Sequence, residues 1–216
     1  MAHLTFSEAA DCIGVSQRQV RNLAAHGEIG LIARGVVDAD SVSAFLRDRG
    51  QVTRRVWSEE TAWAAIGALA DEDISWLGAS QASRLRKQMR GTGAAELASR
   101  IRNRATVHRF DGHRSVTSRV VEQLVSGAAL IGDLTVEREV DGYLDEDRLA
   151  DLVDRFRLRT TSNGTITIRA THHLAKAESI AARDAELLAA VDLATSVDAR
   201  EREAALAVLT ARVAAL

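Results

Sequence analysis

The 216-residue sequence contains no proline, one cysteine and, among its 28 basic residues, only two lysines. The lone Cys12 excludes an internal disulfide and fits a reducing, cytoplasmic setting. No apolar run approaches the roughly 18 residues that a membrane-spanning helix requires, so we expect no membrane segment. The first residues lack a charged stretch that leads into a long apolar run, and we therefore expect no signal peptide.

The composition predicts a folded protein with a real hydrophobic core. Hydrophobic residues make up 46% of the chain and charged residues 27%, and the formal net charge is −2. This balance excludes disorder for most of the chain. The length allows one large domain or two to three small ones.

The small net charge hides two strongly biased blocks. Residues 80–119 hold ten bases and two acids, whereas residues 137–154 hold eight acids and two bases. The basic block is suited to nucleic acid or to an acidic protein, but both blocks are equally explained as solvated helix faces or as surfaces that neutralise each other. The bases that we single out as a second contact with nucleic acid or a partner are Arg84, Arg86, Lys87, Arg90, Arg100, Arg102 and Arg104.

The first helix of the N-terminal segment is predicted from its caps. Thr5 and Glu8 have the spacing of a capping box, and Gly14 is placed to end the helix. The residues between them repeat with the period of one buried helical stripe. That stripe is formed by Phe6, Ala9, Ala10 and Ile13.

A second helix follows after a short turn. Ser16 and Gln19 form a second capping box, and Val15 can pack on Val20 as a hydrophobic staple. The opposite face is polar, and in a helix-turn-helix such a face lies in the DNA major groove, where Arg can pair with guanine and Gln or Asn with adenine. The predicted DNA-binding residues are Ser16, Gln17, Arg18, Gln19, Arg21, Asn22 and, outside this helix, Arg34.

The segment resembles the helix-turn-helix of the MerR and excisionase families. The resemblance is carried by Leu4-Thr5-x-x-Glu8-Ala9-Ala10, Ile13-Gly14-Val15-Ser16, Val20-Arg21-x-Leu23 and His26-Gly27-Glu28-Ile29. It implies a short extended wing over residues 31–38, a third helix over 38–46 and binding to double-stranded DNA. Because residues 1–50 carry five bases and six acids, we expect weak binding by this module alone and a homodimer that spans two half-sites about 34–36 Å apart.

The rest of the chain predicts a fold that is mainly α with a smaller α+β part. We divide it into a helix-turn-helix module (1–50), a helical connector with the basic segment (51–104) and an α+β partner-binding domain with C-terminal helices (105–216). The three tryptophans, close together in sequence, are predicted to form a local core. Helices are expected from Ser58 and over 80–89, 94–104, 115–125, 146–158 and 176–216, with a break near 195–196; strands are expected over 105–110, 128–134, 136–144 with an Asp141-Gly142 turn, and 165–169.

The order of these parts resembles actinobacterial proteins related to the antitoxins of the abortive-infection E type. The residues that carry this resemblance are Trp76-Leu77-x-x-Ser80-x-x-Ser83-Arg84-Leu85-Arg86, Arg104-Ala105-x-Val107-His108-Arg109-Phe110, Gly142-Tyr143-Leu144, Leu149-x-x-Leu152-Val153 and Ala190-Val191-Asp192-Leu193-Ala194-x-Ser196-x-Asp198-Ala199-Arg200-Glu201-Arg202. The resemblance implies a repressor head and a tail that neutralises a nucleotidyltransferase-like toxin.

The sequence carries no catalytic or cofactor motif, so we expect no enzyme, cofactor or metal site. Phosphate-binding glycine loops, paired C-x-x-C and H-E-x-x-H are absent from it. His108 with His113, and His172 with His173, lack further ligands at metal-binding spacing, and the acids at 145–147 are explained by helix capping. Cys12 is predicted to be a packed thiol. Two alternatives stay open: a protein-interaction adaptor without DNA function, and a metal-dependent enzyme of nucleic acid that the basic block would serve.

Overall fold

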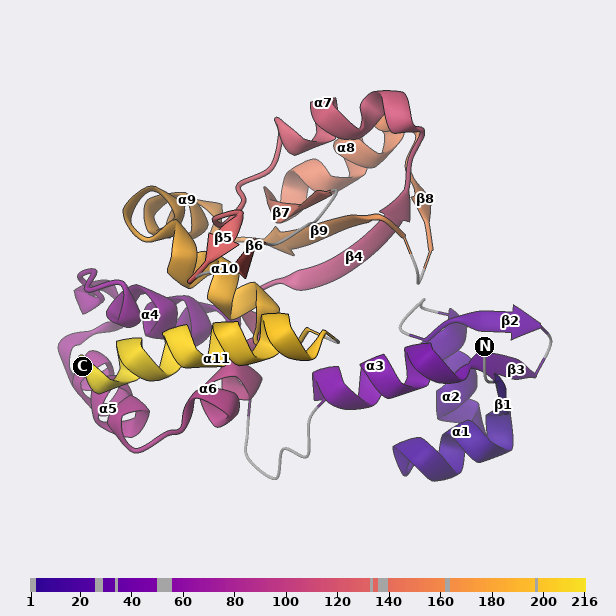
Figure 1. Cartoon of the computed structure of the whole chain (residues 1–216), viewed down its shortest axis with the longest axis horizontal. Coiled ribbons are helices and arrows are strands. Elements are labelled where there is room, and N and C mark those ends of the chain that lie inside the picture. Colours follow the sequence, from indigo (N-terminus) through magenta and orange to yellow (C-terminus); the bar gives the residue numbers. More distant parts are fainter. Residues whose placement is uncertain are drawn as a thin grey trace.

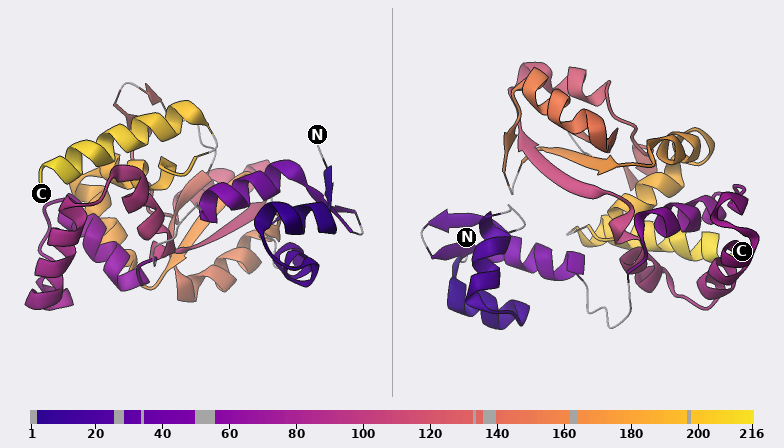
Figure 2. Two further views of the ribbon diagram at one scale, coloured as in Figure 1. Left: turned by 90° about the horizontal axis from the view of Figure 1, so that it is seen from below. Right: turned by 180° about the vertical axis from the view of Figure 1, so that it is seen from behind.

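The computed structural model shows a mainly α-helical fold with a smaller α+β part, as predicted, and 59% of it is helical (Figures 1 and 2). None of the described helices combines the length and apolar composition needed to cross a bilayer. The structure describes residues 3–25, 29–33, 35–49, 56–132, 134–135, 140–161, 164–196 and 198–216.

Residues 3–49 form a module, here called the head, with its own hydrophobic core. Its three short strands form a sheet in the order β1-β3-β2, with β3 antiparallel to both neighbours. The predicted wing is the β2–β3 hairpin, while the pairing of β1 with β3 was not predicted. The elements are β1 (His3–Thr5), α1 (Phe6–Ile13), α2 (Gln17–Ala25), β2 (Leu31–Ala33), β3 (Val36–Asp38) and α3 (Ala39–Arg49).

Both predicted ends of α1 are confirmed. The Glu8 backbone N–H donates to Thr5 Oγ1 (3.2 Å), and the Thr5 N–H donates to Glu8 Oε2 (2.8 Å), which completes the capping box. Gly14 has the left-handed φ of 73° that a helix-ending glycine allows. The prediction for Cys12 is wrong: its thiol is exposed, because Ala9 and Ala10 fill the buried stripe and Cys12 lies outside it.

Residues 56–216 form the second part of the structure, here called the body. It contains eight described α-helices, and Asp184 separates α9 from α10 in addition to the predicted break before α11. The helices are α4 (Glu59–Leu69), α5 (Ala79–Arg90), α6 (Ala94–Arg100), α7 (Thr117–Val121), α8 (Leu149–Phe156), α9 (Leu174–Arg183), α10 (Ala185–Leu193) and α11 (Ala199–Ala214).

The body contains a four-stranded sheet in the order β7-β9-β4-β8. Strand β9 (Ile166–Thr171) pairs in parallel with β7 (Val140–Asp145) and antiparallel with β4 (Thr106–Asp111), which in turn pairs with the short β8 (Arg159–Thr160). Helices α7 and α8 lie over one face of this sheet (Figure 1). There Leu152 and Phe156 of α8 pack with Phe110, Val140 and Ile168 of the strands in one core cluster.

Three predicted features between residues 115 and 145 are wrong in detail. Strand β7 runs straight through Asp141 and Gly142, where a turn was predicted. A Cβ on Gly142 would lie 2.7 Å from Ser126 Oγ, so this glycine serves close packing rather than a turn. The single strand predicted over 128–134 is a hairpin of β5 (Leu130–Ile131) and β6 (Leu134–Thr135), and the helix predicted over 115–125 is limited to α7 and a preceding 3-10 turn.

The largest core cluster joins helices from both ends of the body. It contains Trp63 of α4, Leu85 of α5 and Leu97 of α6 together with Leu188 of α10 and Leu209 of α11. The predicted domain boundary between residues 104 and 105 therefore separates helices that share one hydrophobic core. Helices α4 to α6 bury their apolar faces against the C-terminal helices and do not form a separate connector.

The three tryptophans occupy different environments, so the single predicted cluster is wrong. Trp63 is fully buried, and its Nε1 donates to the Arg104 carbonyl (2.8 Å) and to Thr171 Oγ1 (3.0 Å). Trp57 is half-buried, whereas Trp76 is 38% exposed beneath the Lys176 ammonium. Only Trp63 belongs to the innermost part of the core.

A buried polar network links the sheet to α10. Asp192 Oδ1 accepts from Arg104 Nη2 (2.7 Å) and from the Tyr143 hydroxyl (2.5 Å), and Arg104 Nε donates to that same hydroxyl (2.8 Å). Arg169 Nε lies 3.0 Å from Asp192 Oδ1, and Arg169 also forms an ion pair with Asp141. The network places two guanidinium groups and two carboxylates together inside the body.

Burial and the charges of this network together set its pKa values. Burial alone would raise the pKa of Asp192, but Arg169 and Arg104 outweigh it and hold that pKa below its usual value. Burial raises the pKa of Tyr143, which stays protonated and able to donate. Asp192 is therefore ionised and hydrogen-bonded inside the body at neutral pH.

Candidate nucleic-acid interface

Helix α2 is held in the head by two apolar side chains, which leaves its polar face outward. Val20 is fully buried and Leu23 is 6% exposed, and both belong to the core of the head. The polar residues predicted to read DNA are exposed, so the predicted orientation of the helix is observed. They are Ser16, Gln17, Arg18, Gln19, Arg21 and Asn22.

The turn before α2 fixes where the helix begins. Ser16 Oγ accepts from the Gln19 N–H (3.3 Å), which is one half of the predicted second capping box. The Gln17 amide donates to Ser7 Oγ (3.2 Å) and so bridges α2 to α1. Ser16 and Gln17 thus help to position the helix as well as facing solvent.

The arginines of α2 supply its positive charge. Arg18 and Arg21 are both exposed, and the Arg21 guanidinium lies 5.9 Å from the centre of the Phe6 ring, which supports it on the α1 side. Such a face can place one guanidinium against a base edge and another against a phosphate. Arg34, the remaining predicted contact, lies outside the described residues.

Acidic groups on α1 limit the positive surface to α2. The backbone and side-chain hydrogen bonds from Thr5 lower the pKa of Glu8, so this exposed carboxylate stays ionised. Asp11 is exposed on the same helix. Phosphate contacts by the described part of the head would therefore come from the α2 arginines.

The basic block is only partly available as a second contact. Arg84, Lys87 and Arg90 are exposed on α5, and Arg86 and Arg102 are half-buried. Arg90 also donates to the Leu216 carbonyl oxygen, 3.0 Å from its Nε. The surface formed by α5 is strongly positive, because this helix contains no acid.

The prediction that Arg100 and Arg104 contact a nucleic acid or partner at the surface is wrong, because both side chains are buried. Arg100 is 6% exposed, with an ion pair to Glu96 (2.8 Å) and with the Trp57 ring 5.5 Å from its guanidinium. Arg104 is 8% exposed and is bound to Asp192 in the polar network. Both guanidinium groups are used inside the fold and cannot reach a nucleic acid.

The residues predicted from the sequence to form functional sites did not include the buried carboxylates. Asp192 is the one charged residue in the otherwise buried run Leu187–Leu193, and Arg169 interrupts an alternating strand. A charge inside an apolar run is a signal of a buried ion pair, since unpaired charges are rarely buried. The pairing itself could not be inferred, because the partners lie far apart in the sequence.

Within the described residues, no three His, Cys, Asp or Glu side chains gather as metal ligands. The acids at 145–147 act as predicted at a helix start, where Asp145 Oδ1 accepts from the Asp147 N–H (3.0 Å). A scan against protein-family models and searches of curated proteins and of solved structures found no match to this chain.

Proposed function

We propose that this chain is a cytoplasmic DNA-binding transcriptional regulator that reads double-stranded DNA with helix α2. The observation that carries the proposal is the outward display of Arg18, Gln19 and Arg21 on a helix anchored by buried Val20 and Leu23. A capped turn and a helix of this orientation fit the geometry of major-groove recognition. Two arginines supply few phosphate contacts, so tight binding would require two heads on two half-sites.

We further propose that the chain is an antitoxin that represses its own operon and binds a nucleotidyltransferase-like toxin through the body. This half rests on the sequence resemblance described above. The body supports it by offering a folded surface separate in sequence from the DNA-binding face. The α5 bases Arg84 and Lys87 are exposed for a partner of opposite charge.

The DNA-binding half is tested with the segment upstream of the chain's own reading frame as a labelled duplex. The variant Arg18→Ala with Arg21→Ala should bind at least about tenfold more weakly and lower the salt dependence of log K by about two counterions. The matched control, Arg183→Ala with Arg200→Ala, removes the same charge from exposed positions of the body. Equal affinity of the two double variants would favour an adaptor without DNA function.

The antitoxin half is tested separately by co-expression with the product of the neighbouring reading frame. A stable complex that forms equally well with the Arg18→Ala, Arg21→Ala variant supports partner binding by the body. A complex that requires the head arginines, or none at all, contradicts this half and leaves DNA binding standing.

A further inference from the structure

The body contains a cavity of about 390 Å³ between helix α5 and the segment that precedes this helix, here called the α5 cavity. One wall is the face of α5 that carries Ser83, Arg86 and Arg90, at the three- and four-residue spacing that places side chains on one side of a helix. The other α5 residues at this wall are alanines, whose small side chains leave the space open. The opposite wall is formed by Asp73 and Ser75.

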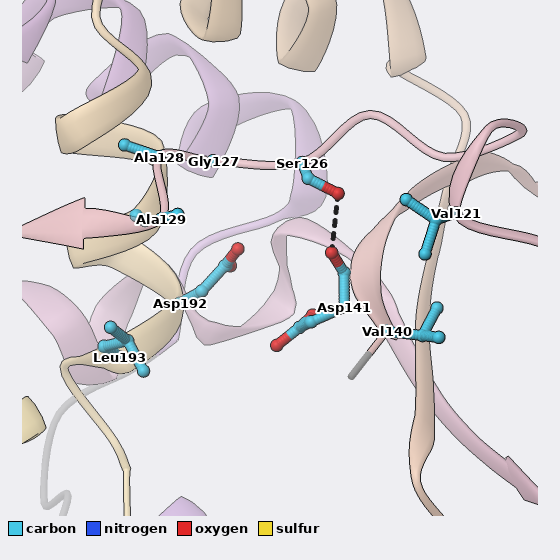
Figure 3. Close-up of a pocket in the computed structure, with 10 residues that line it drawn as sticks. Val121, Ser126, Gly127, Ala128, Ala129, Val140, Asp141, Asp192 and Leu193 are labelled. Atoms are coloured by element: carbon cyan, nitrogen blue, oxygen red, sulfur yellow. Dashed lines mark hydrogen bonds between the residues drawn. The ribbon is translucent and has the colours of Figure 1, made fainter. Parts of the chain in front are cut away.

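A smaller space in the body, of about 210 Å³, has polar groups that are already satisfied. It lies between the loop at 126–129, the start of β7 and helix α10 (Figure 3). Its two acids are paired with arginines of the polar network, Asp141 with Arg169 and Asp192 with Arg104. Ser126 Oγ donates to the Asp141 carbonyl oxygen (2.7 Å), which closes the loop onto β7 (Figure 3). This space therefore belongs to the network.

The cationic groups of the α5 cavity, in contrast, are not saturated by the chain. Arg86 is half-buried, and within the described residues its guanidinium donates no hydrogen bond and forms no ion pair. The Ser83 hydroxyl also has no hydrogen-bond partner in that part of the chain. Arg90 donates to the Leu216 carbonyl oxygen through Nε and Nη2, so both N–H groups of its Nη1 remain for a ligand.

The acid on the opposite wall already has its own donors. The Ser75 N–H donates to Asp73 Oδ1 (2.9 Å), and the Ser75 hydroxyl donates to Asp73 Oδ2 (2.6 Å). These hydrogen bonds, followed by the positive charges of Arg86 and Lys176, lower the pKa of Asp73, which is ionised at neutral pH. Its single negative charge faces a helix with four bases and no acid. The charge balance at the cavity therefore favours an anion.

The arrangement of the donors selects among anions. A phosphate group has at least two terminal oxygens, and a phosphomonoester has three, that accept hydrogen bonds from several directions. A carboxylate has two oxygens in one plane, which a single guanidinium group matches. Two guanidinium groups and a hydroxyl therefore suit phosphate better. Sites for small ligands are about 300–1,000 Å³, so the cavity also has room for an organic group attached to the phosphate.

We propose that the α5 cavity binds a phosphate group, held by Arg86, Arg90 and Ser83. The phosphate belongs to a small phosphorylated molecule or to a nucleic-acid strand, which present the same chemistry to these donors. The inference goes beyond the proposed function, because it involves neither helix α2 nor a toxin. It divides the bases of α5 in two, since Arg84 and Lys87 are exposed outside the cavity.

The first test uses the full chain with inorganic phosphate and, at equal ionic strength, acetate as the carboxylate probe. Binding is followed by amide chemical shifts at Ser75, Ser83 and Arg86. Phosphate should bind saturably at about millimolar concentrations, and acetate should bind at least about fivefold more weakly. Equal binding of the two anions, or no saturable shift, would overturn the proposal.

The variant Arg86→Gln should weaken phosphate binding at least about fivefold. Its matched control, Arg84→Gln, removes the same charge from the same helix outside the cavity and should weaken binding less than about twofold. Equal weakening would show a response to the overall charge of α5 and refute the site. If Arg86→Gln fails to fold, Ser83→Leu fills the cavity and should abolish binding, whereas Ser80→Leu, at an exposed position outside it, should retain binding.

The source of the phosphate is distinguished with AMP and an eight-nucleotide thymidine strand. Binding that depends on Arg86 and is tighter for AMP assigns the cavity to a small phosphorylated molecule, and the reverse order assigns it to a nucleic-acid strand. Loss of the Arg86 dependence with both probes would contradict the proposal. No duplex DNA is used, so failure of this site is distinguishable from failure of the α2 interface.

Discussion

Arg104 and Asp192 form an ion pair with a distance of 2.7 Å between Arg104 Nη2 and Asp192 Oδ1, and both side chains are 9% exposed. Arg104 directly precedes β4, and Asp192 lies near the end of α10, so the pair joins the segment that leads into the sheet to a C-terminal helix. Buried pairs of this kind gain little over apolar packing but are costly to break. Their main effect is to make the helical and sheet parts of the body depend on each other.

Removing the shared acceptor should destabilise the body strongly. Asp192→Asn leaves Arg104 without its carboxylate partner and also removes the negative charge of Asp192 next to Arg169. We expect a loss of about 3–5 kcal/mol in the free energy of unfolding, measured by urea denaturation. Asp154→Asn, an exposed acid on α8, should change it by no more than about 0.5 kcal/mol. Similar values for the two variants would show that the network adds no stability.

The same carboxylate predicts a dependence of stability on pH. Its pKa is lower in the folded state than the ordinary 3.8, so the unfolded chain takes up this proton first as the pH falls. The stabilisation is complete above the unfolded value and decreases below it by about 1.4 kcal/mol per pH unit until the folded pKa is reached.

The free energy difference between the wild type and Asp192→Asn should therefore be constant from pH 7 to 5 and shrink between pH 4 and 3. Urea denaturation at each pH measures it, and the variant itself cancels the contributions of the other carboxylates. A difference that stays constant down to pH 3 would contradict a lowered pKa at this site.

The local features of the head could be predicted from the sequence because they depend on neighbours within a few residues. The Thr5–Glu8 capping box and Gly14 act over one helical turn, and the period of the apolar residues shows which face of α2 is buried. The outward orientation of Arg18 follows from that period alone. The pairing of β1 with β3 could not be predicted, because it joins positions more than thirty residues apart in the sequence.

The turn of the head gives a prediction that links stability to binding. Gly14 has a φ of 73°, where a Cβ is strained although nothing lies within 4 Å of it. Gly14→Ala should cost about 1–2 kcal/mol and raise hydrogen-exchange rates at the amides of Val20 and Leu23, with weaker DNA binding. Cys12→Ala, on the exposed side of α1, is the control and should leave the exchange rates unchanged.

Long-range packing explains what could not be predicted in the body. An Asp-Gly pair favours a turn by local rules, but Gly142 lies in β7 because its neighbours across the structure require the absence of a side chain. Arg104 was grouped with surface bases because its partner, Asp192, is 88 residues away. In both cases the deciding contact lies outside any sequence window.

The close packing at Gly142 is itself testable. A Cβ there would lie 2.7 Å from Ser126 Oγ and 2.8 Å from the Val125 carbonyl oxygen, so Gly142→Ala forces the 124–126 segment away from β7. We expect a loss of about 1–3 kcal/mol in the free energy of unfolding. Gly91→Ala, whose Cβ would meet only the Gln88 carbonyl oxygen at 3.7 Å, should be within about 0.5 kcal/mol of the wild type. Equal losses of stability in Gly142→Ala and Gly91→Ala would mean that residues 124–126 move away from the added Cβ at no cost.

The indole nitrogen of Trp63 links α4 to the sheet by hydrogen bonds, so its removal should destabilise the body. Trp63→Phe keeps an aromatic ring next to Tyr143 but leaves the Arg104 carbonyl without its donor, whereas Thr171 Oγ1 still accepts from the His173 N–H. A loss of about 2–4 kcal/mol is expected from the unpaired carbonyl and the smaller ring, measured by urea denaturation. Trp76→Phe, at a ring that is 38% exposed, should cost less than about 1 kcal/mol. If both variants lose the same stability, the donor at Trp63 is unimportant and α4 is held by apolar contacts alone.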